Sequence, residues 1–391
     1  MKILVINAGS SSIKSKLFEK KKDFIQLAKF HIDGIGLANC KLIFKSENKN
    51  IGLKQKVKTH EEGVKILLKT LVDSGVIENL KEIQAIGHRV VHGGEKYSKP
   101  TKIDARVIKT IEALSSLAPL HNPTNLEAIK ACKKLLPRIP QVAIFDTAFH
   151  QTMPEKAYLY GLPHKLYEKH DIRRYGFHGT SHKYVTEAAI KILKKKNLKT
   201  ISCHIGNGSS ITASISGKST DTSMGFTPLE GIMMGTRSGS IDPAIPLHLQ
   251  KELKMKPAQV DQLLNHESGL QGFSEISSDM RSIYAKYKEK DPRAVLTIET
   301  LSYQIAKYLG AYAAAMNGLD AIIFTGGLGE KAFYVREKAC SYLSHLGLKL
   351  NNKKNENCEE LISDGKSKIK VLVIPTNESL QIARETTKLL Q

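Results

Sequence analysis

The sequence predicts an α/β protein built from two similar lobes that face a common cleft. The chain has 391 residues, which is too long for one small hydrophobic core and suits two domains. It opens with a strand, Ile3–Ile6, a small polar turn, Asn7–Ser12, and a return strand, Ile13–Phe18. The same order of strand, Gly/Ser/Asn turn and strand recurs over Thr200–Ile215, with its turn at Gly206–Ser210. This recurrence indicates an internal duplication.

Both turns have a composition that suits an anion. Glycine and serine leave backbone N–H groups and hydroxyls unobstructed, so a phosphate can approach them closely. Lys14 follows the first turn and adds a positive charge. A single turn of this kind is usually only a turn, so the prediction of phosphate binding depends on its recurrence.

The chain is strongly basic, with 59 lysines and arginines against 38 aspartates and glutamates. This balance fits nucleic acid, a membrane surface or small anionic substrates. The lysine runs are scattered, and no aromatic residues interleave with them as base stacking requires. These runs are Lys20–Lys22, Lys194–Lys196 and Lys353–Lys354. We interpret them as solvated side chains and predict neither a nucleic-acid nor a membrane partner.

The five cysteines lie far apart and form no CxxC pair. This usage is typical of reduced thiols in the cytoplasm. The N-terminal apolar run is too short for a signal peptide, and no apolar run is long enough to span a bilayer. The sequence therefore predicts a cytoplasmic protein.

The first half of the chain continues as strands followed by helices. Short alternating apolar and polar pieces over residues 24–58 predict meander strands. Apolar residues at helical spacing predict a helix over Thr59–Val72, where Thr59 and Glu62 resemble a capping box. A second helix is predicted over roughly residues 124–135.

Two strands of this half carry charged residues. The strand that begins at Ile83 contains Arg89, and a charge among apolar residues requires either a structural salt bridge or a ligand. The strand Gln141–Phe145 delivers Asp146 at its end. Ligands of open α/β sheets bind at the carboxyl ends of strands, so Asp146 is a candidate for chemistry.

Two histidines precede and begin a helix predicted over about residues 181–196. His178 and His182 are four residues apart, a spacing that permits a shared metal on a helix. Gly179 lies between them, and no further Cys, Asp or Glu ligand accompanies the pair. The sequence therefore argues against zinc at this place.

A long loop follows the second hairpin. Ser223–Pro243 contains four glycines and no clean period, which is typical of an ordered, functional loop. Within it, Arg237 lies between Gly235 and Gly239, so its charge sits on a backbone that is free to bend. Helices are predicted after it over residues 244–270 and 291–317.

The last part of the chain contains a glycine-rich turn. Ala321–Glu330 has the pattern of a strand, a Gly-rich turn and a helix start, which suits phosphates or the sugar of a nucleotide. It matches neither a Walker motif nor a dinucleotide fingerprint. A final strand at Val371–Ile374 and a helix over residues 379–390 close the chain.

These candidates together indicate a phosphotransferase. Isolated Asp and Glu side chains with Asn7 suit a Mg²⁺ ion that keeps most of its waters, and Arg and His suit the charge of a transferring phosphoryl group. A hydroxyl acceptor needs a base, for which Asp146 could serve. A carboxylate acceptor is already ionised and needs cations instead. The bidentate binding of carboxylate and phosphate by Arg89 and Arg237 favours the carboxylate modestly.

The chain resembles the acetate kinase family in nine motifs that run from its start to its C-terminal helix. The motifs are VINAGSSSIK, GHRVVHGG, APLHNP, FDTAFHQTMP, YGFHGTSH, HIGNGSS, MGFTPLEGIMMGTRSGSIDPA, FTGGLGE and IPTNE. The resemblance implies two ribonuclease-H-like, actin-like lobes of duplicated βββαβαβα topology, with a nucleotide cleft between them. The implied N-terminal lobe is 1–148 plus 380–391. The implied C-terminal lobe is 149–379, with the nucleotide site and the dimer interface.

The resemblance also assigns roles to residues. It implies a catalytic set of Asp146, Arg89, Arg237 and His178, in which Asp146 orients an arginine or the metal rather than acting as a base. It implies an acetate pocket formed by Arg89, Val91, Leu120, His121, Phe177 and Pro228. It implies a metal site at Asn7 and Glu378. It implies a nucleotide site at Lys14, His204, Ile205, Gly206, Asn207, Gly208, Asp279, Met280, Arg281, Gly327, Leu328, Gly329, Glu330 and Lys331.

The implied reaction is reversible in-line transfer of a phosphoryl group from ATP to acetate, giving acetyl phosphate and ADP. The implied cofactor is Mg²⁺, for which Mn²⁺ can substitute, and the implied assembly is a homodimer. Val91 favours a short acid, because a smaller residue there would open the pocket. Ser240 stands where many members carry Asp, and Lys331 stands where Asn is usual.

Three alternatives stay open at this point. A propionate or butyrate kinase would use the same mechanism, since one methylene is worth only about 1–3 kcal/mol in a pocket. A sugar kinase of the same superfamily would need Asp146 as its base. A basic nucleic-acid-binding protein would show steeply salt-dependent binding.

Overall fold

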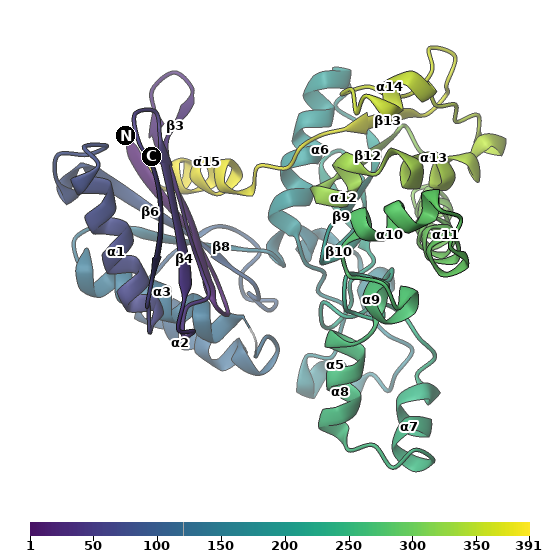
Figure 1. The fold of residues 1–391 in the computed structure, drawn as a ribbon, viewed down its shortest axis with the longest axis horizontal. Coiled ribbons are helices and arrows are strands. Elements are labelled where there is room, and N and C mark those ends of the chain that lie inside the picture. The colour runs from purple at the N-terminus through teal and green to yellow at the C-terminus, as the bar shows by residue number, and fades with distance from the viewer. Residues whose placement is uncertain (120) are drawn as a thin grey trace. The chain divides into compact units, whose positions relative to one another are not determined.

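The chain folds into two compact units (Figure 1). The computed structural model describes residues 1–119 and 121–391. Unit 1 comprises Met1–Phe149 together with Asn377–Gln391, and unit 2 comprises His150–Thr376. The C-terminal segment therefore returns to the unit in which the chain begins.

An eight-stranded sheet forms the centre of unit 1, in the order β5-β4-β3-β2-β1-β6-β8-β7. The strands are β1 (Lys2–Gly9), β2 (Ser12–Lys20), β3 (Phe24–Asp33), β4 (Cys40–Ser46), β5 (Asn50–Gln55), β6 (Ile83–Val90), β7 (Thr101–Lys102) and β8 (Gln141–Phe145). β1 to β5 pair antiparallel in succession, which confirms the predicted meander. β6 lies parallel to β1 and β8 parallel to β6.

The five-stranded sheet of unit 2 repeats this topology, in the order β11-β10-β9-β12-β13. Its strands are β9 (Lys199–Ile205), β10 (Ser209–Ile215), β11 (Lys218–Thr222), β12 (Ala321–Thr325) and β13 (Lys370–Val373). β9, β10 and β11 are antiparallel, while β12 and β13 continue parallel to β9. Without the β4–β5 hairpin and the edge strand β7, unit 1 has the same order of third, second, first, fourth and fifth strand. The predicted duplicated α/β topology is therefore confirmed.

The described residues contain fifteen α-helices. They are α1 (His60–Asp73), α2 (Ala105–Ala113), α3 (Asn122–Leu135), α4 (Glu155–Tyr158), α5 (Lys165–His170), α6 (Gly179–Leu193), α7 (Ala244–Lys251), α8 (Pro257–His266), α9 (Gly269–Ser274), α10 (Met280–Lys288), α11 (Pro292–Ala315), α12 (Gly326–Lys331), α13 (Phe333–Ser341), α14 (Asn352–Glu356) and α15 (Glu378–Leu390). Short 3₁₀ segments lie at Leu80–Glu82, Leu114–Ser116, Ala148–Thr152 and Ser344–Leu346. None of the helices in residues 1–119 and 121–391 is both long and apolar enough to cross a bilayer.

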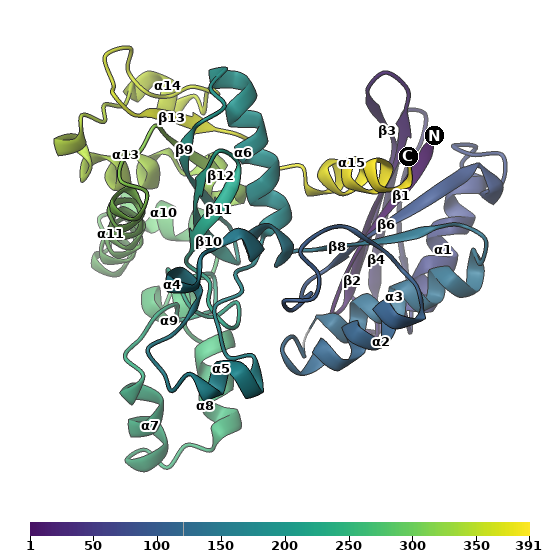
Figure 2. The ribbon, with the colours of Figure 1, turned by 180° about the vertical axis from the view of Figure 1, so that it is seen from behind.

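Helices cover both faces of each sheet around its parallel strands, whereas alternate residues of β4 in unit 1 are exposed. In unit 1, α1 and α3 pack on one face, and α15 packs on the other against β1, β6 and β8 (Figures 1 and 2). In unit 2, α11 and α13 share a core with one face of the sheet, and α6 packs on the opposite face. Strand side chains alternate between faces, so Leu4 and Ile6 join the α1 side while Ile3 and Val5 join the α15 side.

The helices α6 and α15 each pack on the sheet of the other unit from the one whose strands precede them in the chain. α6 follows the last strands of unit 1 but packs on the sheet of unit 2. α15 follows the last strand of unit 2 but packs on the sheet of unit 1. The exchange brings the first residue of α15, Glu378, into unit 1.

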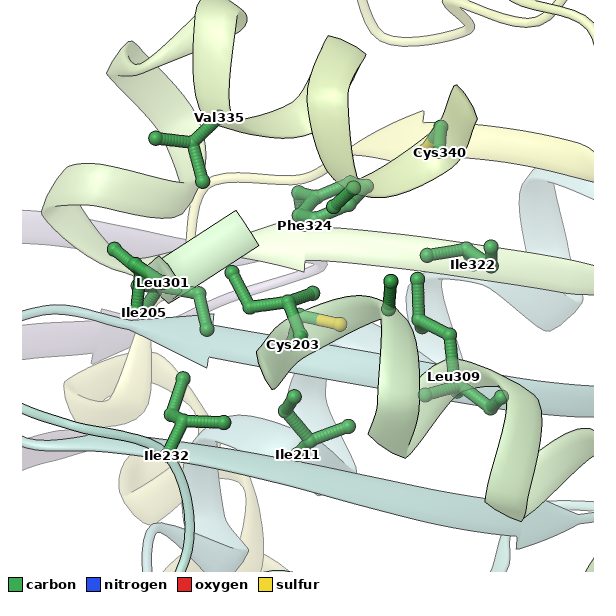
Figure 3. Close-up of a cluster of buried hydrophobic side chains, with 14 of the residues drawn as sticks. Cys203, Ile205, Ile211, Ile232, Leu301, Leu309, Ile322, Phe324, Val335 and Cys340 are labelled. Carbon is green, nitrogen blue, oxygen red and sulfur yellow. The ribbon is translucent and has the colours of Figure 1, made fainter. Parts of the chain in front are cut away.

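The larger core of unit 2 is shown in Figure 3. Cys203, Ile211 and Phe324 from the sheet face Leu301 and Leu309 from α11, and all five are fully or almost fully buried. At about 25 cal/mol per Å² of apolar surface, burial of each large side chain stabilises the unit by roughly 1.5–3 kcal/mol. This core fixes β9 and β12, whose carboxyl ends carry the candidate site.

Two expected boundaries are wrong. The first hairpin has its tip at Ser10–Ser11 rather than over residues 7–12, because the β1–β2 pairing continues through Asn7 and Lys14. The helix expected over residues 244–270 is three helices, α7 to α9. Lys254 adopts a left-handed conformation at φ 55°, and Pro257 begins a new helix, so the backbone cannot continue through either.

The buried histidine of β6 predicts a pH dependence of stability. His88 is buried and bonded to Gln141, and burial lowers its pKa to about 4 despite this hydrogen bond. Between pH 6.5 and 4 the unfolded chain binds a proton at this position and the folded chain does not. The free energy of unfolding therefore falls as the pH decreases, by about 2 kcal/mol between pH 7 and pH 5.

Urea denaturation of wild type and His88→Gln at pH 7, 6 and 5 measures this effect. Other groups titrate equally in both proteins, so the loss attributable to His88 is the difference between the two pH profiles. Parallel profiles would contradict the prediction.

Candidate active site

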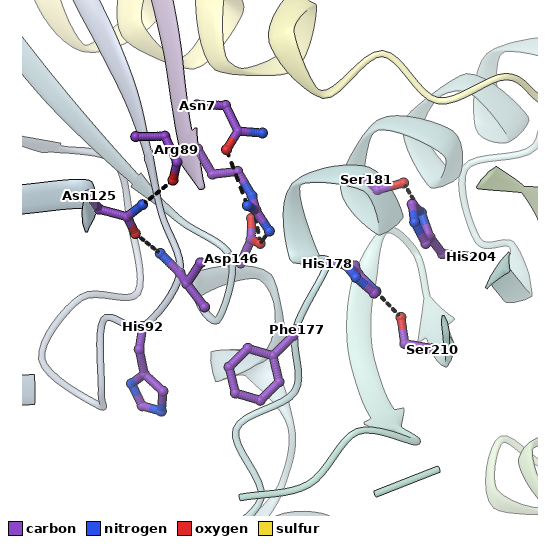
Figure 4. A network of polar contacts seen from close by, with 12 residues as sticks. Asn7, Arg89, His92, Asn125, Asp146, Phe177, His178, Ser181, His204 and Ser210 are labelled. Atoms are coloured by element: carbon purple, nitrogen blue, oxygen red, sulfur yellow. Dashed lines mark hydrogen bonds and ion pairs between the residues drawn. The ribbon is translucent and has the colours of Figure 1, made fainter. Parts of the chain in front are cut away.

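The polar residues of unit 1 gather at the carboxyl ends of its parallel strands (Figure 4). Asn7 lies near the end of β1, Arg89 near the end of β6, and Asp146 directly after β8. β1, β6 and β8 are neighbours in the sheet, so three residues far apart in sequence meet at one edge. This is the edge at which open α/β sheets bind ligands.

Arg89 is held by Asp146. Its Nε and Nη2 atoms donate to Oδ2 of Asp146 at 2.9 and 2.5 Å, and Nη1 donates to Oδ1 of Asn7 at 3.3 Å. Burial alone would lower the pKa of Arg89, but the carboxylates of Asp146 and Glu378 outweigh it and raise the pKa. The salt bridge foreseen for Arg89 therefore exists, and it orients the guanidinium at the edge of the sheet.

Glu378 brings a second carboxylate toward Arg89. It is the first residue of α15 and is half-buried. Burial raises its pKa and Asp146 raises it further, while Arg89 and Lys14 act in the opposite direction. No side-chain donor in residues 1–119 and 121–391 is hydrogen-bonded to this carboxylate. An acceptor of this kind beside Asp146 is suited to a cation.

Two asparagines at the start of α3 fix the loop that follows β6. Asn125 accepts from the backbone N–H of Val91 at 3.0 Å and donates to the carbonyl of Ala8 at 2.8 Å. Asn122 accepts from the N–H of His92 at 3.1 Å. Sequence reasoning missed both roles, because Val91, His92 and Ala8 lie 30 or more residues away from these asparagines. The expected contact residue Leu120 lies outside the described residues.

Unit 2 presents its polar residues at the corresponding edge. His204 is the last residue but one of β9 and precedes the turn Gly206–Gly208, and His178 lies directly before α6. The rings of His178 and His204 stack with centroids 4.3 Å apart (Figure 4). His178 has a left-handed backbone at φ 56°, which costs a non-glycine residue roughly 1–2 kcal/mol. Such strain is characteristic of functional positions.

Serine hydroxyls join the histidines of this edge. Ser210 Oγ lies 2.8 Å from Nδ1 of His178 and 2.7 Å from Nε2 of His182. Ser181 Oγ lies 2.8 Å from Nδ1 of His204. Burial lowers the pKa of His182, with smaller contributions from His150 and His204, so His182 is neutral at pH 7. His178 and His182 therefore belong to one hydrogen-bonded network, and the described chain holds no cluster of three or more His, Cys, Asp or Glu side chains that could bind a metal.

Arg237 is the candidate cation of unit 2. Its Nη1 donates to the carbonyl of Pro228 at 3.3 Å and lies 3.8 Å from Sδ of Met234. A Cβ atom on Gly208 would lie 3.6 Å from Nη1 of Arg237 and 3.4 Å from Nε2 of His178, so both side chains border this turn. No carboxylate pairs with Arg237 anywhere in the described chain, and burial lowers its pKa. A partly buried guanidinium without a counter-ion is suited to an anionic ligand.

A cavity of about 740 Å³ opens beside the same turn. It is large enough for a nucleotide. Eight of the residues expected to bind a nucleotide line it: Gly206, Asn207, Asp279, Met280, Arg281, Gly327, Leu328 and Lys331. His204, Ile205, Gly208, Gly329 and Glu330 are not among the lining residues. Lys14 belongs to unit 1.

Glu330 has a different task within unit 2. Its Oε1 accepts from the backbone N–H groups of Gly326 at 3.1 Å and Thr376 at 3.4 Å. A Cβ on Gly326 would approach the carbonyl oxygen of Ile205 to 2.7 Å, so only glycine permits this contact between α12 and β9. Glu330 thus links the segments that follow β12 and β13.

Three aromatic residues of the cavity were not foreseen. Tyr284 and Tyr334 stack with centroids 3.7 Å apart, and Phe333 meets Tyr284 edge-on at 6.2 Å. All three line the cavity. Tyr284 lies in the middle of α10, while Phe333 and Tyr334 begin α13. No local pattern brings them together, although an aromatic pair soon after a glycine-rich segment was a usable signal.

The repeated sheet, a nucleotide-sized cavity and an unpaired arginine beside a glycine turn define a phosphotransferase of the duplicated actin-like fold. The sequence profile of the acetokinase family matches residues 2–384. The chain belongs to the acetokinase family.

Individual relatives align with this chain over almost their full lengths. An acetate kinase of Thermotoga maritima is 52% identical over 400 residues, covering 100% of this chain and 99% of its own. An acetate kinase of Carboxydothermus hydrogenoformans is 52% identical over 397 residues, with the same coverage. The crystal structure of the Porphyromonas gingivalis acetate kinase superposes with a TM-score of 0.94 at 44% identity, covering 100% of both chains. A propionate kinase of Francisella tularensis also has a TM-score of 0.94 and 44% identity, covering 99% of both chains.

Proposed function

We propose that the protein is an acetate kinase, which transfers the γ-phosphoryl group of ATP to acetate and gives acetyl phosphate and ADP. The observation that carries this is Arg237, a partly buried guanidinium with no carboxylate partner in the described chain, beside His178 and the turn at Gly208. Both substrates are anions, so they supply the counter-charge that the fold does not. The acetate kinases among its relatives support the same assignment.

The arginines have separate tasks in this proposal. Acetate is ionised at neutral pH, so in-line attack on the γ-phosphorus needs no general base. It needs cations that hold two mutually repelling anions together. Arg237 offsets the charge of the transferring phosphoryl group, His178 stabilises the transition state beside it, and Arg89 binds the carboxylate. Asp146 is a positioning residue that fixes Arg89, since its Oδ2 atom accepts two hydrogen bonds from that guanidinium.

The residues of unit 1 fit a Mg²⁺ ion. The Glu378 carboxylate, the Oδ1 atom of Asn7 and the neighbouring Asp146 are oxygen donors of the kind that Mg²⁺ prefers. When bound, Mg²⁺, or Mn²⁺ in its place, would offset the negative charge of the ATP phosphates. Asn7 and Glu378 would hold it through oxygen atoms, while Lys14 contributes a further positive charge.

The substrate pockets follow from the same assignment. We assign the cavity lined by Asn207, Asp279 and Gly327 to the adenosine and phosphates of ATP. For the acyl group we assign Val91 and His121 in unit 1, with Leu120, which lies outside the described residues, and Phe177 and Pro228 in unit 2. Val91 and Phe177 are buried apolar side chains, as a methyl group requires.

We also propose a homodimer in the cytoplasm. Unit 2 exposes apolar side chains on α7 and α11, including Leu247, Leu296 and Tyr303, each of them more than half exposed. We assign these side chains to the subunit interface, because association of subunits removes exposed apolar surface from water. The five cysteines are all free thiols, which fits a reducing compartment.

Formation of acyl phosphate with Mg-ATP, trapped as the hydroxamate, tests this function. Acetate, propionate and butyrate are compared side by side, and we expect the highest kcat/KM with acetate. The similarity to a propionate kinase makes propionate the second candidate. A preference for propionate or butyrate would retain the mechanism and overturn the interpretation of Val91. Absence of any acyl phosphate would discard the carboxylate acceptor and favour a sugar kinase with Asp146 as base.

A further inference from the structure

Three side chains of unit 2 that have no assigned role in the reaction form a polar cluster. Tyr160 and Arg174 come from the segment that leads to Phe177 and His178. Glu230 comes from the loop that carries Pro228 and, further on, Arg237. We call Tyr160, Arg174 and Glu230 the clamp, because they join these two segments.

Arg174 makes the ionic part of the clamp. Its Nη2 lies 2.5 Å from Oε1 of Glu230. Its Nη1 donates to three successive carbonyls, those of Thr222 at 3.0 Å, Ser223 at 3.1 Å and Met224 at 3.2 Å. One guanidinium therefore holds both the start of the loop and its residue 230. Only 17% of the Arg174 side chain is exposed, so solvent screens these bonds weakly.

Tyr160 completes the clamp from a second side. Its hydroxyl donates to Oε2 of Glu230 at 2.6 Å and accepts from the backbone N–H of Phe226 at 2.9 Å. Both oxygens of Glu230 are therefore engaged by the segment that leads to His178. A Cβ on Gly225 would lie 1.9 Å from Oε2 of Glu230, so the loop has no spare room at this point.

The backbone continues the connection toward the site. The carbonyl of Gly225 accepts from the N–H groups of Tyr175 at 3.0 Å and Gly176 at 3.3 Å. The next residue after Gly176 is Phe177, and Pro228 lies three residues after Gly225. The clamp thus fixes the spacing of the two segments that lead to Phe177 and to Pro228 of the proposed acyl pocket.

We propose that the clamp is a positioning device that sets the acyl-chain specificity of the enzyme. The inference depends on the proposed function, because it assigns the clamp to the pocket of that reaction. Phe177 and Pro228 can exclude a longer acid only if their backbones are held at a fixed separation. Charged hydrogen bonds with defined geometry hold it better than apolar packing, which tolerates small shifts.

Glu230→Gln and Tyr160→Phe test the proposal. Each variant is assayed for kcat and KM with acetate, propionate and ATP. We expect the ratio of kcat/KM for acetate to that for propionate to fall by about fivefold, which is part of the roughly 10- to 200-fold discrimination that one methylene can confer. The KM for ATP stays unchanged. A purely structural role would lower kcat/KM for acetate and for propionate by the same factor.

Two matched variants are the controls. Glu299→Gln removes a carboxylate from an ion pair of the same unit, with Lys338 at 2.9 Å. Tyr175→Phe removes a hydroxyl whose bond, to the carbonyl of Asp171 at 2.9 Å, stays within its own segment. We expect both to keep the wild-type ratio.

The outcomes separate the clamp from the function itself. Tyr160→Phe keeps the ion pair between Arg174 and Glu230, so this variant tests the proposal if Glu230→Gln does not fold. An active wild type with an unchanged ratio in folded Tyr160→Phe overturns the clamp alone. A wild type that forms no acyl phosphate overturns the proposed function and the clamp together.

Discussion

Replacing Arg237 by alanine is expected to lower kcat/KM for acetyl phosphate formation by about a hundred- to a thousandfold. This is the usual cost of removing one preorganised donor to a charge that develops in the transition state. The fold should persist, because within the described residues the Arg237 side chain makes only a 3.3 Å bond to the carbonyl of Pro228 and a sulfur contact, and no carboxylate there is left unpaired. Steady-state kinetics with far-UV circular dichroism measures both effects.

Two further variants sharpen this experiment. Arg237→Lys keeps the charge but loses the planar fork, so we expect activity between wild type and Arg237→Ala. Arg293→Ala removes an exposed arginine of the same unit, paired with Glu275 at 3.7 Å, and should leave kcat/KM unchanged. Full activity in Arg237→Ala would contradict the assignment of Arg237 to the phosphoryl site.

Arg89 and Arg237 carry the same charge but differ in how the protein holds their side chains. Arg89 has two donors on one oxygen of Asp146, so the protein itself fixes its orientation. Arg237 has no such anchor in the described chain, and its loop must be held by other means. The clamp of Tyr160, Arg174 and Glu230 supplies those means at the start of the same loop.

Most of the fold was predictable from local patterns. The hairpins, the strand Gln141–Phe145 and the final helix follow from apolar periodicity, and the repeat of the first hairpin indicated the duplication. The errors arose where one local signal was overridden. Turn-forming Asn7 continues a strand because Lys14 pairs with it, and Pro257 restarts a helix that periodicity alone would continue.

Residues of the candidate site were predictable only where a reactive residue type also stands in a telling place in the sequence. Asp146 follows a buried strand and Arg237 lies among glycines, so both are visible in sequence. Asn125 acts through partners 34 and 117 residues away, and Tyr284 acts by stacking on Tyr334. The clamp likewise joins residues 56 to 70 positions apart. Pairings of this range depend on the tertiary fold and leave no local pattern.

Replacing Glu378 by glutamine is the second change expected to have a large effect. We expect kcat/KM for Mg-ATP to fall by about a hundredfold or more, since a bound metal contributes several kcal/mol of charge stabilisation. The reason is the donor set: the Glu378 carboxylate has no hydrogen-bonded side-chain donor in residues 1–119 and 121–391, and it lies in the field of Asp146 and Arg89. The Mg²⁺ concentration for half-maximal activity should rise in parallel.

A direct measurement separates metal binding from a general loss of activity. Titration of Mn²⁺ by electron paramagnetic resonance, in the presence of ADP, should show weaker binding to Glu378→Gln than to wild type. Glu112→Gln, which removes an exposed carboxylate paired with Lys130 at 3.4 Å in the same unit, should bind Mn²⁺ as wild type does. Equal Mn²⁺ affinity in Glu378→Gln and wild type would remove Glu378 from the metal site. Its raised pKa would then reflect burial beside Asp146 alone.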